Sequence, residues 1–186
     1  RDAKLRGAGM KRAKTLVSSA EHSVGSKEAP EAARIELRNL LNDMDVYASR
    51  VEELLGMIGE KLKEIPYIDK LMAIKGVGVI TVSGFIAEVG EIKRFDDPKQ
   101  LQKLAGYAIV TNQSGKHKGE SRISYRGRKR LRYVLYEAAL SLVGRNSEFK
   151  AIHEYYRTRR ENPLKKMQSV VAGACKVIRI FYVILT

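Results

Sequence analysis

A serine followed by a glycine opens the most cationic stretch of the chain. Between Thr111 and Tyr133, which includes the pair Ser114 and Gly115, eight Lys and Arg face a single acid, Glu120. A serine hydroxyl can attack the phosphorus of a phosphodiester when fixed positive charge stabilises the negative charge that grows on the phosphoryl oxygens. The stretch therefore raises two hypotheses, a nucleophilic serine or a basic nucleic-acid-binding loop with a bystander serine. Composition alone favours the second, because neutralisation of a phosphate backbone explains the charge without catalysis.

The same stretch supplies most of the candidate phosphate contacts. Arginine suits this task because it stays charged and donates two parallel hydrogen bonds to a phosphate. At helical spacing Arg128 and Arg132 share a face, and Lys129 lies beside them. The basic residues of the stretch that we expect to contact nucleic acid are Lys116, Lys118, Arg122, Arg126, Arg128, Lys129, Arg130 and Arg132.

A second candidate phosphate site lies in residues 67–90, where two apolar helical stretches are joined by a glycine-rich turn. Gly76 and Gly78 form a Gly-x-Gly turn, which is typical of a helix-hairpin-helix. Such a turn brings backbone N–H groups and a helix N-terminus to a phosphate, with Lys75 as a helpful neighbour. A tight turn between two packed helices explains the same residues without a ligand, so both interpretations stay open.

The charge of the whole chain also indicates a polyanionic partner. The net charge is +14 over 186 residues, and residues 111–186 hold 17 Lys and Arg against five acids. Nucleic acid and an anionic membrane surface are the two classes of partner that such a surface suits. The C-terminal run "VIRIFYVILT" is too short to span a bilayer, so we expect a buried helix and no membrane association.

The sequence predicts neither a metal site nor a cofactor site in this chain. The three histidines are scattered, and no phosphate-binding loop or dinucleotide fingerprint occurs. Asp96 and Asp97 are better explained as helix-capping residues than as metal ligands. Cys175 is the only cysteine, which excludes an internal disulfide and fits a reducing compartment. Its apolar context indicates a buried, inert thiol.

A heptad pattern over residues 30–65 predicts a coiled coil. The apolar residues are spaced alternately by four and three positions, and eight acids and five bases occupy residues 31–65 around them. Pro30 suits a first helical turn and Pro66 ends the helix. Pairing between two chains is the favoured interpretation, and a long amphipathic helix packed on its own domain is the alternative. The seam consists of Leu37, Leu41, Met44, Ala48, Val51, Leu55, Ile58, Leu62 and Ile65.

The remaining elements complete a mainly α fold with at most a small β element. Residues 1–29 are a basic N-terminal segment and joint, with a helix over part of 3–20, and residues 66–186 form a compact helical domain. Within it, "FDDPKQLQKLAGY" predicts a short helix capped by Asp97 and ended by Gly106. The strand candidate "YAIVTN" can pair with "SRISY", which lies within the basic Ser-Gly loop, residues 111–130. Helices are expected after Gly127, at 147–161 and at 164–185.

Three motifs in order resemble the C-terminal transposase domain of the IS110/IS116 family of insertion-sequence recombinases. They are "IKGVGVITVSGFIAEVG", "RFDDPKQLQKLAGY" and "SGKHKGESRISYRGRKRLRYVLYEAAL", which together cover roughly residues 66–150. The chain departs from the family pattern at 108–110, where a proline is common, and at Arg128, where asparagine is common. Neither departure touches the Ser-Gly pair.

The resemblance implies a function in DNA recombination. Ser114 would be the nucleophile that becomes linked to DNA, and a structured guide RNA would select the target and donor sites. A RuvC-like domain with Mg²⁺-binding acids would precede the coiled coil. Because the chain opens with Arg1, we expect it to be part of a longer protein and inactive without that domain. The partners implied are DNA, the RNA and a second copy through the coiled coil, with pairing into a tetramer in the recombination complex, at the nucleoid of a prokaryotic cytoplasm.

Two other classes of function remain open on the residues alone. One is a non-catalytic helix-hairpin-helix module that binds nucleic acid, and the other is a basic scaffold that assembles through its coiled coil. Only the recombinase hypothesis needs the hydroxyl of Ser114. Salt-dependent binding of DNA or RNA separates the first two from the scaffold.

Overall fold

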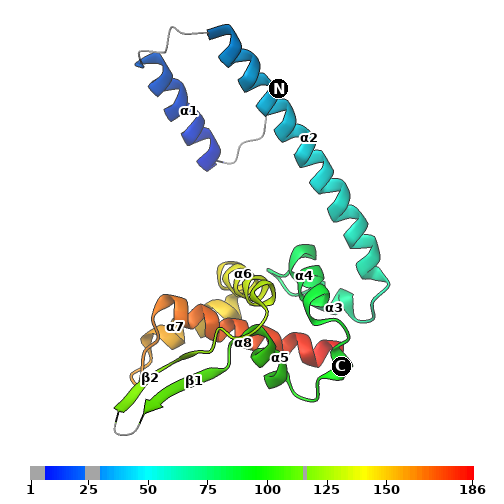
Figure 1. The fold of residues 1–186 in the computed structure, drawn as a ribbon, viewed down its shortest axis with the longest axis vertical. Helices are drawn as coiled ribbons and strands as arrows, with labels where there is room; N and C mark the ends of the chain where they lie inside the picture. Colours follow the sequence, from blue (N-terminus) through cyan, green and yellow to red (C-terminus); the bar gives the residue numbers. More distant parts are fainter. Residues whose placement is uncertain (1–6, 24–29, 115–116) are drawn as a thin grey trace. The chain divides into compact units, whose positions relative to one another are not determined.

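The computed structural model describes residues 7–23, 30–114 and 117–186, and the side chains of residues 7, 8 and 112–120 lie outside this description. The chain divides into two compact units, Arg1–Val51 and Glu52–Thr186. Helices dominate both units, and the one sheet within the described residues is a two-stranded antiparallel hairpin, as Figure 1 shows. The predicted mainly α fold with a small β element is confirmed.

The N-terminal unit holds helix α1, Gly7–Glu21, and most of helix α2, Pro30–Lys63. Helix α2 begins at Pro30 as predicted, because a proline at the first helical position lacks only an N–H that would have no intrahelical partner. Its 34 residues form one continuous helix with Glu31 in the first turn and Lys61 and Lys63 in the last. Those charges oppose the partial charges at the two helix ends and stabilise them.

The predicted apolar seam of α2 is exposed over most of its length. Leu37, Met44 and Val51 of the first unit are each more than half exposed. In the second unit the seam turns toward the core, where Leu62 is 6% exposed and Ile65 packs beside it. The C-terminal end of the seam therefore packs within the chain, as the alternative interpretation required. The rest of the seam, toward the N-terminus of α2, exposes the apolar surface that a coiled-coil partner would cover.

The C-terminal unit consists of short helices around two long ones. Its elements after α2 are α3 (Ile68–Met72), α4 (Val79–Val89), the 3₁₀ helix η1 (Ile92–Arg94), α5 (Pro98–Ala105), β1 (Ile109–Ser114), β2 (His117–Ile123), α6 (Lys129–Arg145), α7 (Ser147–Thr158) and α8 (Lys166–Leu185). Helix α6 packs on α4, α7 and α8, and α8 also contacts α3, α5 and α7.

The core forms where apolar faces of these helices meet. Leu131, Leu135 and Leu142 recur along one face of α6 and are fully buried. Phe85 of α4 meets Phe181 of α8 edge to face, with ring centroids 5.1 Å apart. This is the geometry that the quadrupoles of two aromatic rings favour. The core thus ties the helix-hairpin-helix region to the last helix of the chain.

Helix α8 corrects one part of the sequence interpretation. The run around Val183 is by itself too short to cross a bilayer, but the helix begins at Lys166 and its 20 residues are long and apolar enough to do so. Its inward face, which includes Ala174, Val177 and Ile178, is nevertheless buried against the other helices. This burial fits the predicted role as a core helix. The length of the C-terminal run was the wrong ground for that prediction, because the whole helix is longer than the run.

Local signals placed the short helix α5 correctly. The Asp97 side chain accepts a hydrogen bond of 2.6 Å from the Lys99 backbone N–H, and Pro98 takes the first turn. Gly106 ends the helix with φ +76°, a left-handed conformation that favours glycine. The chain then turns directly into β1.

Candidate functional site

The serine of the Ser-Gly pair lies at the far end of the hairpin. β1 and β2 pair antiparallel from Ile109 with Ile123 to Ser114 with His117, with an irregularity between Thr111 and Gln113. Pairing of the two predicted strand segments is confirmed, and the strands extend further toward each other than the sequence indicated. The Ser114 side chain lies outside the described residues. Lys116 lies outside them altogether, and Lys118 is placed by its backbone alone.

The structure separates Ser114 from the arginines after β2. At the base of the hairpin the Ser124 N–H donates to the Ala108 carbonyl, and the Tyr125 N–H donates to the Gly106 carbonyl. Six residues of extended strand between positions 108 and 114 span about 20 Å. Arg126 and the residues after it therefore lie at one end of the hairpin and Ser114 at the other. Of the basic residues placed on the strands, Arg122 lies opposite Val110, between these ends.

Arg128 at the N-cap of α6 and Arg132 one turn later both contact carbonyls of neighbouring helices through their side chains. Arg128 Nη1 donates to the Glu88 carbonyl, one of the last carbonyls of α4. Arg132 Nη1 donates to the carbonyls of Ala105 and Tyr125, at 3.0 and 3.2 Å. A cation beside the last carbonyls of a helix is stabilising, since those carbonyls carry partial negative charge and have no intrahelical partner. Both guanidinium groups thus have structural partners.

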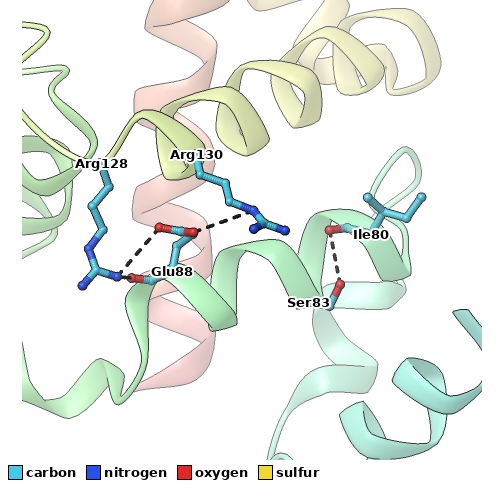
Figure 2. Close-up of polar contacts among 5 residues, drawn as sticks. All are labelled: Ile80, Ser83, Glu88, Arg128 and Arg130. Carbon is cyan, nitrogen blue, oxygen red and sulfur yellow. Dashed lines mark hydrogen bonds and ion pairs between the residues drawn. The ribbon is translucent and has the colours of Figure 1, made fainter. Parts of the chain in front are cut away.

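Glu88 of α4 holds the first turn of α6 by charge, as Figure 2 shows. Its carboxylate lies 3.8 Å from Arg128 Nη1 and 3.8 Å from Arg130 Nε, and its side chain is 18% exposed. These distances are ion pairs without hydrogen bonds. Arg130 is 83% exposed and keeps its donors available to an incoming anion. Glu88 was absent from the sequence prediction, because a lone acid in an apolar helix carries no pattern.

A cationic surface remains at the start of α6 and on β2, which we call the α6 basic surface. Its members, Arg122, Arg126, Lys129 and Arg130, are exposed. Within the described part of the chain, the side chains of Arg122, Arg126 and Lys129 make no hydrogen bond or salt bridge. The first turn of α6 holds no acid, so the positive end of the helix adds to the side-chain charges. The surface can bind phosphate oxygens.

The glycine-rich turn before α4 is partly taken up by packing. Gly76 has φ +106°, and a Cβ there would lie 3.3 Å from the backbone of Ser141 and Leu142. Its carbonyl accepts a hydrogen bond of 2.8 Å from Ser141 Oγ. Gly78 instead faces open space at the N-terminus of α4, and Lys75 is exposed. The packing interpretation accounts for Gly76, while phosphate contact by Lys75 and Gly78 stays a prediction.

Two buried groups between the last helices of the unit, His153 and Ser169, are partners of each other. Ser169 Oγ lies 2.8 Å from His153 Nδ1, and both side chains are buried between α7 and α8. Burial lowers the pKa of His153, and the nearby charges of Arg157 and Lys166 lower it further. Burial raises the pKa of the Cys175 thiol, which keeps it protonated and unreactive. No group of three or more His, Cys, Asp and Glu within the described ranges could hold a metal ion.

Two comparisons with known proteins both find transposases. Residues 68–157 match the Transposase IS116/IS110/IS902 family. A protein of Pseudomonas aeruginosa named "Probable family 20 transposase" is 26% identical over 107 residues, which are 58% of this chain. The matched region covers 32% of that protein, so the chain spans about a third of its length.

Proposed function

Residues 68–157 form a transposase domain of the IS116/IS110/IS902 family, and on that premise we propose that the chain binds DNA and supplies Ser114 as the nucleophile for strand cleavage and exchange. The α6 basic surface is the observation that carries the proposal for DNA binding. It gathers exposed cations at a helix N-terminus that holds no acid, on a unit of high positive charge. Such a surface neutralises phosphates without reading base sequence.

The chemistry assigned to Ser114 exchanges one phosphodiester for another. The serine hydroxyl oxygen bonds to a backbone phosphorus, and the bond from phosphorus to one deoxyribose oxygen breaks. The serine proton passes to a base, and the released DNA hydroxyl takes up a proton. Attack of a DNA hydroxyl on the serine ester reverses these steps and rejoins a strand. No ATP is required because the ester retains the bond energy.

The distance along the hairpin limits which charges assist that reaction. Arg126, Arg128 and Arg130 of the same chain are about 20 Å of strand from Ser114, beyond the reach of an arginine side chain. The charge that stabilises the transition state is therefore assigned to Lys116 and Lys118 or to another domain or copy. We place Mg²⁺ in a RuvC-like domain outside this chain. No group of three or more metal-ligating residues for it occurs among the residues that the structure describes.

The assembly we propose is a homodimer formed through the exposed part of α2, with pairing into a tetramer during recombination. Leu37, Met44 and Val51 would be covered in that pairing, which removes their apolar surface from water. A structured guide RNA is the second nucleic-acid partner, and the same basic surface suits it because phosphate contacts do not distinguish DNA from RNA. Because these partners are nucleic acids, we propose that the protein is located at the nucleoid of a prokaryotic cytoplasm.

A non-catalytic nucleic-acid-binding module is the second candidate function. The separation of Ser114 from the α6 basic surface favours it, since a binding module needs the cations and not the hydroxyl. The two candidates make the same prediction for DNA affinity and opposite predictions for a covalent protein–DNA product.

The salt dependence of DNA binding tests the shared part of the proposal. Arg126, Lys129 and Arg130 are changed together to Ala, and the dissociation constant for duplex DNA is measured across a series of salt concentrations. Each phosphate that the variant no longer neutralises lowers the slope of log affinity against log salt by about 0.9. We expect a fall of about two to three and equal weakening on unrelated sequences. A matched triple change of Arg157, Arg159 and Arg160 keeps the net charge equal, and an equal effect in both variants would refute the assignment to α6.

A further inference from the structure

The base of the β1–β2 hairpin is closed by one arginine. We propose that Arg132 is a positioning residue: it fixes the direction in which the hairpin leaves the helical unit and so sets the place of Ser114. This inference rests on the proposed function in its last step, because only a reacting serine makes the direction matter for chemistry. The contacts that carry it lie in residues 104–109 and 121–132, all within the C-terminal unit.

A single nitrogen of Arg132 bridges the two segments of the chain that form the hairpin base. Nη1 donates to the carbonyl of Ala105, before β1, and to the carbonyl of Tyr125, after β2. The guanidinium also lies over the Tyr125 ring, 5.3 Å from its centroid. Tyr125 has φ +54°, a left-handed conformation that a tyrosine keeps only when its surroundings hold it. Arg132 supplies two of those interactions.

The surrounding backbone is packed too closely for the base to tilt freely. Gly127 has φ +152°, and a Cβ there would overlap the Leu104 carbonyl oxygen. The Arg128 N–H donates to that same carbonyl at 2.7 Å. Ser124 Oγ donates to the Gly106 carbonyl at 3.2 Å. The end of α5, the base of the hairpin and the start of α6 therefore form one block.

Tyr107 ties the start of the hairpin to α6 from the other side. Its side chain is buried, and its hydroxyl donates a 2.8 Å hydrogen bond to the Arg132 carbonyl. Burial raises the pKa of Tyr107, so the hydroxyl stays protonated and remains a donor. Arg132 is thus held through its own backbone while its side chain holds the hairpin.

The hairpin beyond this block acts as a lever. Ile109 is 75% exposed, which places the start of β1 outside the core. Five residues of strand carry Ser114 about 17 Å further. A tilt of about 10° at the base therefore moves Ser114 by about 3 Å, whereas a misplacement of about 1 Å can slow a reaction about a hundredfold. Contacts at the base accordingly control chemistry at the tip.

Lysine cannot replace arginine in this role although it keeps the charge. The planar guanidinium donates in fixed directions and stacks on an aromatic ring at once, whereas an ammonium is a point charge on a flexible stem. Arg132→Lys therefore separates positioning from charge. A phosphate ligand would tolerate the change better, because lysine also binds phosphate.

The test uses the full-length protein with its RNA and compares Arg132→Lys with Arg145→Lys, an exposed residue at the other end of α6. DNA affinity and the single-turnover rate of covalent adduct formation are measured separately. We expect Arg132→Lys to bind DNA within about twofold of wild type and to form the adduct at least about tenfold more slowly. Arg145→Lys should match wild type in both. An equal loss of affinity and rate in Arg132→Lys would show that Arg132 acts through DNA binding and would overturn the proposal.

Hydrogen exchange of this chain gives a readout that does not depend on the chemistry of Ser114. Arg132→Lys should speed amide exchange in residues 109–111 and 121–123 and leave the core amides of α4 and α8 unchanged. Tyr107→Phe, which removes only one hydroxyl, should act in the same direction with a smaller effect. Unchanged hairpin exchange in both variants overturns the proposal, and so does faster exchange with an unchanged adduct rate. A wild-type protein that forms no adduct while the exchange changes as expected contradicts the nucleophile instead.

Discussion

Gly127 is the residue whose substitution should damage the candidate site most directly. In Gly127→Ala the new Cβ would overlap the Leu104 carbonyl oxygen and lie 2.7 Å from the Gly106 nitrogen. A normal carbon–oxygen contact is about 3.3 Å or longer, so the two backbone segments must move apart. These atoms belong to backbone, and no side-chain rotation can relieve the overlap.

The expected loss of unfolding free energy combines backbone strain with one broken hydrogen bond. The φ of +152° costs an alanine about 1–3 kcal/mol. Separation of the segments also breaks the 2.7 Å hydrogen bond from the Arg128 N–H to the Leu104 carbonyl, worth about 1 kcal/mol. We expect the free energy of unfolding to fall by about 2–4 kcal/mol, a large part of the stability of an ordinary domain.

Urea unfolding followed by circular dichroism measures this change, with Gly144→Ala as the matched control. Gly144 lies in α6 with open space around its Cβ position, and alanine in a helix is favoured over glycine by about 0.5–1 kcal/mol. The control should therefore be as stable as wild type or slightly more stable. A fall below about 1 kcal/mol in Gly127→Ala would refute the close packing described for the hairpin base.

Three further predictions concern the charge, the assembly and the pH dependence of the chain. Glu88→Gln removes the acid beside Arg128 and Arg130, so DNA affinity should rise about threefold or more at low salt. An unchanged or weaker affinity in a filter-binding assay would contradict the proposed role of this acid. Met44→Asp should convert a dimer to a monomer in sedimentation, because it buries a charge in the α2 seam. Asn42→Asp, which lies outside the seam, should leave the dimer intact. Two monomeric or two dimeric variants would disprove the pairing. His153 has a lowered pKa, so its contribution to stability is complete above about pH 6.5 and is lost as the pH falls below that value. The difference in unfolding free energy between wild type and His153→Gln should therefore shrink from pH 7.5 to pH 5.5. A constant difference would contradict the burial argument.

Local sequence signals predicted the elements of the fold well. Pro30 at the start of α2, and the capping Asp97 with Gly106 at the ends of α5, act within a few residues of their own position, so the sequence alone reveals them. The heptad pattern likewise predicted a long helix. It did not reveal that Leu62 and Ile65 pack in the core of the C-terminal unit, because that packing depends on how distant segments come together.

The candidate site was predicted less completely, for the same physical reason. The sequence placed Ser114 and the arginines in one basic loop, and only strand pairing reveals that they lie at opposite ends of a hairpin. Spacing predicted that Arg128 and Arg132 share a face, but not that carbonyls of α4 and α5 meet that face. Glycine was the available signal, since Gly106 and Gly127 both mark the close backbone approach at the hairpin base.

The most direct test of the central claim is the covalent product formed by Ser114. The full-length protein with its RNA is incubated with labelled DNA, and the protein–DNA adduct is trapped by denaturation and located by mass spectrometry. Ser114→Ala should abolish the adduct while DNA affinity stays within about twofold, because the α6 basic surface is unchanged. Ser121→Ala, on the paired strand β2, should still form it. An adduct in the Ser114→Ala protein, or one located on another residue, would contradict the assignment and favour a module that only binds nucleic acid.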